Sequence, residues 1–239
     1  MQFHIGTSGW MYDHWRGEFY PSELPKTKWF SHYSRHFSTV ELNSSFYHLP
    51  GEKAFDTWRD KAPDGFIYAV KVSRYITHMK RLRDVEEPLE TFIARARLLG
   101  DKLGPLLYQL PPGLKRNDAV LEAFLKLLPH DLQHVLEFRN ESWFDDEVSA
   151  LLRKYNAGFC IYDLPGTTTP LVATADFGYV RFHGSVGLYD SCYTDSELES
   201  WAKRITRLGK GLSAVYVYFN NDSHAHAIRN AGRLRELLE

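Results

Sequence analysis

The sequence predicts one (β/α)8 barrel that spans residues 1–239. Eight short runs rich in β-branched and aromatic residues recur along the chain, and most of the gaps between them carry apolar residues at helical spacing. Eight strands alternating with helices over 239 residues is the size and order of a TIM barrel. An open doubly wound sheet is the alternative, but the GTSGW segment after the first run is not its usual G-x-G-x-x-G phosphate turn.

Each expected element follows from a local pattern. The strands are expected, in order, at residues 3–8, 39–43, 66–72, 105–110, 134–139, 158–163, 178–184 and 214–220. Helical spacing of apolar residues covers 29–37, 52–61, 89–99, 121–128, 148–155, 194–205 and 228–238. Thr194 and Glu197 form a capping-box pair that starts the sixth of these helices. Residues 164–177 hold two prolines and three consecutive threonines, so the sixth crossover is expected to lack a regular helix.

Composition excludes several classes of protein. Lys and Arg total 29 and Asp and Glu total 30, so net charge gives no bulk attraction to nucleic acid or membranes, although a local basic patch stays open. Cys160 and Cys192 have no metal-type spacing and form no disulfide framework. No leader-like segment and no apolar run of membrane-spanning length is visible, so a reduced, cytoplasmic protein without a membrane partner is expected. Nothing in the sequence indicates an oligomeric state.

Polar residues follow the alternation of the expected strands. Neighbouring residues of a strand point to opposite faces, and the carboxyl ends of barrel strands form the functional face. Val40 and Leu42 suit the helix layer, which leaves Glu41 and Asn43 facing the barrel mouth. Buried charges are costly unless they are paired or functional. The same alternation places these further residues at the mouth: Lys71, Glu137, Arg139, Arg181, His183 and Asn220. Asp163 is placed there because it ends the sixth expected strand.

These side chains suggest chemical roles. Glu41 and Glu137 are candidates for an acid/base pair whose environments separate their pKa values. Lys71 is a candidate partner of Glu41 or an electrophile, and a Schiff-base role is also open. Arginines could hold anionic groups, and a histidine could carry a proton. The predicted catalytic residues are Glu41, Lys71, Glu137, Arg139 and His183. An internal ion-pair network that only closes the barrel top is the alternative explanation.

Aromatic residues gather in the loops that would leave the strands, whereas the short entering loops KAPDG, PHDLQ, NA and GKGLS have none. This asymmetry predicts stacking surfaces around the mouth rather than a larger core alone. His78, in the basic stretch SRYITHMKRLRD, is expected nearest the site. The predicted substrate-binding residues are Trp10, Tyr12, Trp15, Asn43, Tyr47, His78, Asp163, Arg181 and Asn220.

Metal and nucleophile readings have weaker support, and no cofactor is predicted. His4, His183, Glu137 and Asp163 could converge on a divalent metal, but no helical H-x-x-x-H pattern supports this. The GTSGW segment lacks the spacing of a G-x-S-x-G nucleophile elbow, so Ser8 is not expected to be a nucleophile.

Seven stretches together resemble the YecE-like family, the domain of unknown function numbered seventy-two. They are GTSGWMYDHWRGEFYP, VELNSSFYHLP, KVSRYITH, YQLPP, LEFRNESW, RFHG and YFNNDSHAHAIRNAGRL. The resemblance spans the chain and implies a TIM barrel, but it implies no reaction. Two departures occur: Ser185 stands where the family often has a basic residue, and Ala225 where it often has glycine.

Three functions are consistent with these observations. The first is an enzyme, a hydrolase, lyase or isomerase, that uses acid/base chemistry on a small anionic or ring-bearing molecule such as a sugar phosphate or nucleotide. The second is a nucleic-acid-binding or nucleic-acid-processing protein that uses the same face, since aromatics interleaved with Arg and Lys suit single strands. The third is a scaffold without catalysis.

Overall fold

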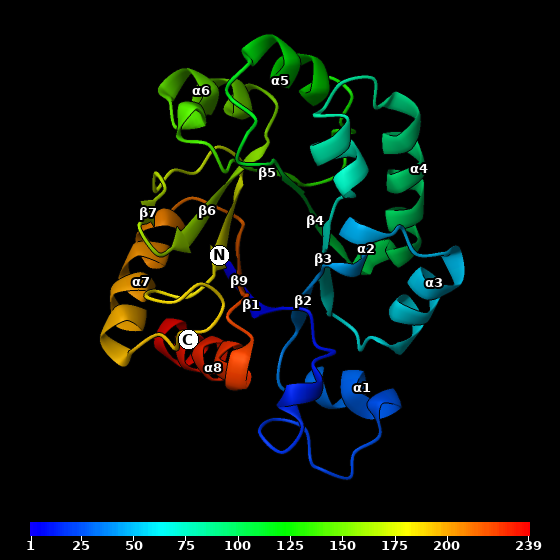
Figure 1. Ribbon diagram of the computed structural model, residues 1–239, viewed down its shortest axis with the longest axis vertical. Helices are drawn as coiled ribbons and strands as arrows, with labels where there is room; N and C mark the ends of the chain where they lie inside the picture. Colours follow the sequence, from blue (N-terminus) through cyan, green and yellow to red (C-terminus); the bar gives the residue numbers. More distant parts are fainter.

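Eight parallel strands close into a barrel in this computed structural model, which describes residues 1–239 apart from the side chain of Thr168 (Figure 1). The strand order is β1-β2-β3-β4-β5-β6-β8-β9, with β9 pairing to β1 to close the ring. The strands are β1 (Gln2–Ser8), β2 (Thr39–Leu42), β3 (Ile67–Lys71), β4 (Leu103–Gln109), β5 (His134–Glu137), β6 (Gly158–Leu164), β8 (Phe177–Phe182) and β9 (Ala214–Phe219). The predicted fold class is therefore confirmed.

Helices surround the barrel on its outside (Figure 1). The main ones are α1 (Trp29–Tyr33), α3 (Glu52–Lys61), α4 (Glu86–Ala96), α5 (Asp118–Leu125), α6 (Asp146–Lys154), α7 (Asp195–Leu208) and α8 (His226–Leu238). Thr194 and Glu197 form the expected capping box at the start of α7. Within the described residues, none of these helices combines the length and apolarity that crossing a bilayer requires.

Irregular segments occupy several of the loops that leave the strands. After β6 the chain forms β7 (Thr167–Thr168), which pairs antiparallel with β6, in place of a crossover helix. The absence of a helix there was expected, but the short strand was not. A four-residue helix, α2 (Ser44–Tyr47), follows β2, and a π-helical turn (Tyr75–Met79) follows β3. Such π-turns occur frequently at functional sites.

Alternate residues of each strand build two separate apolar layers. The outer layer joins the strands to the helices through residues such as Val40, Leu42 and Val180. The inner layer fills the barrel and consists of Ala69, Leu107, Val135, Cys160, Phe177, Tyr179, Ala214, Tyr216 and Tyr218. Because the inner residues stop short of the strand ends, the polar residues with the same alternation lie above them, at the carboxyl-terminal mouth.

Gly6 marks a point where β1 and β2 approach closely. A Cβ atom at position 6 would lie 2.3 Å from the carbonyl oxygen of Thr39 and 3.1 Å from the hydroxyl of Tyr33. We expect Gly6→Ala to lower the free energy of unfolding by about 2 kcal/mol, because the obstructing atom is backbone and cannot rotate away. Equilibrium urea denaturation measures this, with Gly113→Ala as the control because its Cβ would meet nothing within 4 Å. Equal midpoints for the two variants would contradict the expectation.

Candidate functional site

A buried arginine joins two glutamates at the mouth of the barrel. Arg181, on β8, donates from Nε to Oε2 of Glu41 at 2.9 Å and from Nη2 to Oε1 of Glu41 at 2.7 Å. Its Nη1 donates to Oε2 of Glu137, on β5, at 2.7 Å. All three side chains are essentially inaccessible to solvent. Arg181 therefore bridges β2 and β5, which lie on different sides of the barrel, through a forked guanidinium that Lys could not replace.

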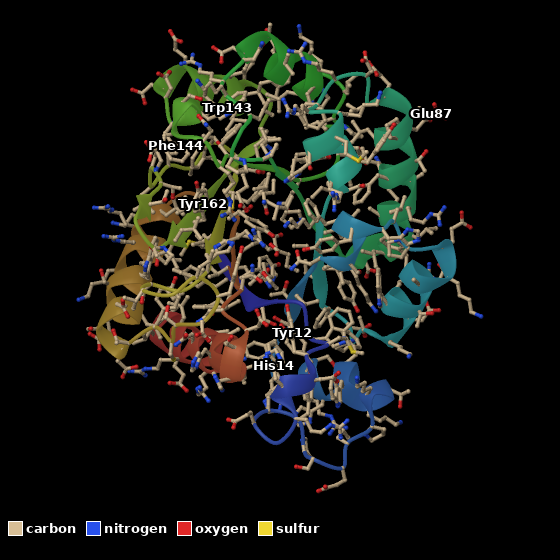
Figure 2. All side chains as sticks on the ribbon, in the orientation of Figure 1. Tyr12, His14, Glu87, Trp143, Phe144 and Tyr162 are labelled. Carbon is tan, nitrogen blue, oxygen red and sulfur yellow. The ribbon has the colours of Figure 1, made fainter. Side chains whose placement is uncertain are left out.

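Glu137 receives a second arginine. Arg139 donates from Nε to Oε1 of Glu137, so both carboxylate oxygens accept from a guanidinium. Burial alone would raise the pKa of Glu137, but the charges of Arg139 and Arg181 outweigh it and hold that pKa well below its ordinary value. The guanidinium carbon of Arg139 also lies 4.6 Å from the ring centroid of Tyr162, a residue of β6 that Figure 2 labels. Glu137 is thus a permanent carboxylate and not a proton donor.

Glu41 is saturated with donors in the same way. Besides Arg181, it accepts from the Ser8 hydroxyl at 2.8 Å and from the Tyr179 hydroxyl at 2.7 Å. The sequence prediction missed Ser8 and Tyr179. Two signals could have found them: Tyr179 shares a strand face with Arg181, and Ser8 is directly opposite Glu41 in the β1–β2 register. Glu41 and Glu137 therefore form a rigid ionic frame, which matches the ion-pair alternative better than an acid/base pair.

Lys71 lies at the end of β3 and takes no part in this frame. It is half-buried, and among the described residues it has no carboxylate within 4 Å. The expected ion pair between Lys71 and Glu41 is therefore wrong, because Arg181 occupies the carboxylate. The ammonium instead lies 4.1 Å from the ring centroid of Phe46. Burial, followed by the charge of Arg181, lowers the pKa of Lys71 to about 8.

His183 follows β8 and is fully buried beside Arg139. Its Nε2 lies 3.0 Å from Nη2 of Arg139, and because a guanidinium can only donate, Nε2 accepts and the ring proton resides on Nδ1. Nδ1 has no hydrogen-bond partner in the part of the chain that the structure describes. Burial and the charges of Arg181 and Arg139 lower the pKa of His183 well below its ordinary value. His183 is consequently a neutral imidazole with an unused N–H.

Three predicted binding residues lie in the loops around Lys71. His78 belongs to the π-helical turn, and burial, with Lys71 and Arg74 adding to it, lowers its pKa. Its ring lies 5.1 Å from that of Phe46, so Phe46 has Lys71 and His78 as neighbours. Asn43 follows β2, and its Oδ1 is buried without a partner in the described residues. Tyr47 is 72% exposed on α2, and its ring packs edge-on against Phe46 at a centroid distance of 5.1 Å.

Asp163 and Asn220 are not part of the charged cluster. The carboxylate of Asp163 accepts a hydrogen bond from the Tyr193 hydroxyl at 2.8 Å, and the Tyr193 ring packs on Phe182 of the outer layer. Placing Asp163 at the mouth was wrong because it has the opposite strand parity to Cys160 and Tyr162. Burial raises the pKa of Asp163. Asn220 follows β9, and its backbone N–H donates to the carbonyl of Phe182 at 2.7 Å.

The predicted stacking aromatics of the loop after β1 pack against other parts of the protein. Trp15 is fully buried, and its indole N–H donates to the carbonyl of Asp222 at 2.8 Å. Tyr12, labelled in Figure 2, donates from its hydroxyl to the carbonyl of Ser8 and packs on Trp15 at a centroid distance of 4.7 Å. Trp10 is buried against Phe30. Because Trp15 is fully buried, it cannot stack on a ligand. Neighbouring aromatic residues of a long loop can pack on one another as well as on a ligand.

The suggested metal ligands do not converge. His4 stacks on Tyr216 at 4.7 Å in the lower part of the barrel, whereas His183 lies at the mouth and Asp163 on the outer face. In the described residues, His, Cys, Asp and Glu side chains form no group of three or more with an arrangement suited to a metal ion.

Comparison with known proteins agrees with the fold. Residues 4–239 match the family described as "Protein of unknown function DUF72". The UPF0759 protein YunF of Bacillus subtilis (strain 168) is 28% identical over 269 aligned positions, which cover 99% of this chain and 94% of YunF. The UPF0759 protein YecE of Escherichia coli (strain K12) is 31% identical over 113 residues, 47% of this chain and 42% of YecE.

Solved structures of the same family have the same architecture. The crystal structure of the DUF72 family protein TM1631 from Thermotoga maritima superposes with a TM-score of 0.91 and 28% identity, and the match covers 100% of this chain and 99% of that one. The DUF72 family protein EF0366 from Enterococcus faecalis has a TM-score of 0.87, with coverage of 99% and 95%, and at 19% identity it supports the fold alone. Because the family match extends over nearly the whole sequence, this chain belongs to the DUF72 family.

Proposed function

We propose that the protein is an enzyme whose barrel mouth binds the anionic group of a small molecule, with Lys71 as the cation that receives it. The observation that carries this proposal is the charge of the cluster. Three cationic side chains, Lys71, Arg139 and Arg181, accompany two carboxylates, and the arginines occupy both carboxylates. Among the described residues, the Lys71 ammonium therefore has no carboxylate within 4 Å, and it lies at the face where barrel enzymes bind their substrates.

The remaining polar groups suit proton transfer near that anion. The pKa of Lys71, about 8, makes roughly a tenth of it neutral at pH 7, so it can exchange a proton with a bound molecule. His183 offers a neutral N–H donor beside Arg139, and such a donor can stabilise negative charge that develops on an oxygen. In this proposal Glu41 and Glu137 orient the cations and do not themselves transfer protons.

Sulfate tests the proposal because its own charge is constant between pH 7 and pH 9. We expect sulfate affinity, measured by isothermal titration calorimetry, to fall about tenfold over this interval as Lys71 loses its proton. Lys71→Met should bind weakly at both pH values and show no such step, whereas the surface variant Lys154→Met should behave as the wild type. Sulfate binding that is independent of pH and of Lys71 would refute the proposal.

Exposed tyrosines favour nucleic-acid binding as a second candidate function. Tyr47, Tyr75 and Tyr189 are 72%, 43% and 41% exposed on the loops that leave β2, β3 and β8. Stacking on bases is a common use of such rings. The net charge of −1 gives a polyanion little additional attraction. A single-stranded oligonucleotide in the same titration decides between the two, since binding far tighter than that of sulfate and strongly salt-dependent would favour nucleic acid.

A further inference from the structure

A cavity of about 540 Å³ lies between α1 and α3, beside the mouth. Its walls come from the loop after β1, the end of β2 and the facing sides of the two helices. Trp10, Phe30 and Trp58 supply its aromatic surface, with Trp10 edge-on to the other two at centroid distances of 5.3 and 6.5 Å. Trp58 is only half-buried, so part of a large ring is left uncovered. The volume is in the range that small-molecule sites have.

The polar groups of this cavity favour one class of occupant. Lys26 and Lys61 are exposed residues of its lining, and none of the described residues that line it is acidic. Lys26 pairs with Asp13, whereas Lys61 has no carboxylate within 4 Å in the described part of the chain. A cationic ligand is disfavoured by these ammonium groups, although aromatic surfaces otherwise attract cations. The lining fits a flat apolar ring that carries negative charge.

The cavity adjoins the anion site. Asn43 and Ser44 line it and directly follow Leu42, which the β2–β3 register pairs with Val70, the residue before Lys71. Residues paired in this way lie about 5 Å apart between Cα atoms. The hydroxyl of Ser45 donates to the carbonyl of Lys71 at 2.7 Å, which ties the two segments together. A molecule of nucleotide size can therefore reach both places.

We infer that this cavity binds the aromatic ring of the same ligand whose anionic group lies at Lys71, an inference that rests on the proposed function. The substrate class is then a ring-bearing anion, with the ring against Trp58 and the charged group one strand away. Trp58, which lies in the helix expected over residues 52–61, becomes the residue that selects the ring.

Sulfonates of increasing ring size test this inference, since their charge does not change near pH 7. By isothermal titration calorimetry we expect naphthalene-2-sulfonate to bind at least tenfold more tightly than methanesulfonate. Trp58→Ala should abolish that preference and leave methanesulfonate affinity unchanged. Trp201→Ala is the matched control, because Trp201 is also a half-buried helix tryptophan but lies on α7, and it should retain the preference.

Two results would overturn the inference, and they are distinguishable. If methanesulfonate still responds to Lys71→Met but the ring brings no gain, or if Trp58→Ala and Trp201→Ala behave alike, the ring subsite is wrong and the anion site stands. If neither sulfonate responds to Lys71→Met, the proposed function fails and the shared-ligand inference fails with it.

Discussion

Replacement of Arg181 by Met should lower the free energy of unfolding by about 4 kcal/mol, the range observed when one partner of a buried ion pair is removed. Arg181 supplies three hydrogen bonds to two carboxylates that water does not reach. Without it, the donors that remain to Glu41 among the described residues are the hydroxyls of Ser8 and Tyr179. Glu137 keeps Arg139 and the weak Cys160 thiol, whose Sγ lies 3.7 Å from Oε2. Arg181→Lys should give an intermediate loss, because it restores the charge but not the fork. Equilibrium denaturation at pH 7 measures both variants.

Acidification should reduce the difference in the free energy of unfolding between the wild type and Arg181→Met. In the wild type the depressed pKa of Glu137 contributes stability that is present above the ordinary carboxyl pKa and is lost as pH falls toward the folded value. In Arg181→Met, protonation of Glu137 removes the cost of burying its charge. The free energies of unfolding of the two proteins should therefore converge between pH 7 and pH 4. Arg233→Met, which breaks an exposed pair with Asp195, should leave the denaturation midpoint nearly unchanged. If Arg181→Met is as stable as Arg233→Met, the ion pairs of Arg181 with Glu41 and Glu137 do not stabilise the fold as expected.

Lys71→Met should have the opposite effect on stability while it removes ligand binding. A lysine whose pKa falls from 10.5 to about 8 on folding destabilises the native state whenever it is protonated. We therefore expect Lys71→Met to raise the free energy of unfolding by about 2 kcal/mol at pH 7, after discounting the full shift for partial exposure. The same change should weaken sulfate binding at least tenfold. A gain in stability with a loss of binding is typical of a group retained for function.

The pH dependence of that gain provides its own check. The cost of protonated Lys71 is complete below pH 8 and disappears as pH rises from 8 to 10.5, so the wild type should become as stable as the variant over that interval. Lys154→Met, at an exposed lysine paired with Glu122, should show no such convergence. A destabilised Lys71→Met protein would indicate that the lysine has a counter-charge and would remove the basis of the anion site.

Much of the fold could be predicted because its signals are local. Each barrel strand is a short apolar run, and the parity of Val40 and Leu42 correctly separated the helix-facing residues from Glu41. The capping box at Thr194 and the missing helix after β6 also depend on neighbouring residues only. The strand β7 and the π-helical turn were not predictable, since two-residue pairings and π-turns have no periodic signature.

The site was predictable as a set of residues but not as a set of partners. Strand parity placed Glu41, Glu137 and Arg181 on one face, yet only the closed barrel shows that Arg181 reaches both glutamates and leaves Lys71 alone. The placement of Asp163 at the mouth was wrong because the alternation of side chains was not applied at the end of its strand. The prediction that Trp15 binds substrate was wrong because no local sequence pattern separates a loop tryptophan that faces a ligand from one that anchors the loop.

The bridge made by Arg181 also has a consequence for the lifetime of the native state. Its contacts join residues 140 and 44 positions apart, so they close only after most of the chain is already ordered. Interactions that form after the transition state slow unfolding without accelerating folding. We therefore expect the buried frame at the mouth to slow unfolding, and so to protect the folded protein from transient opening and from the proteolysis that follows it.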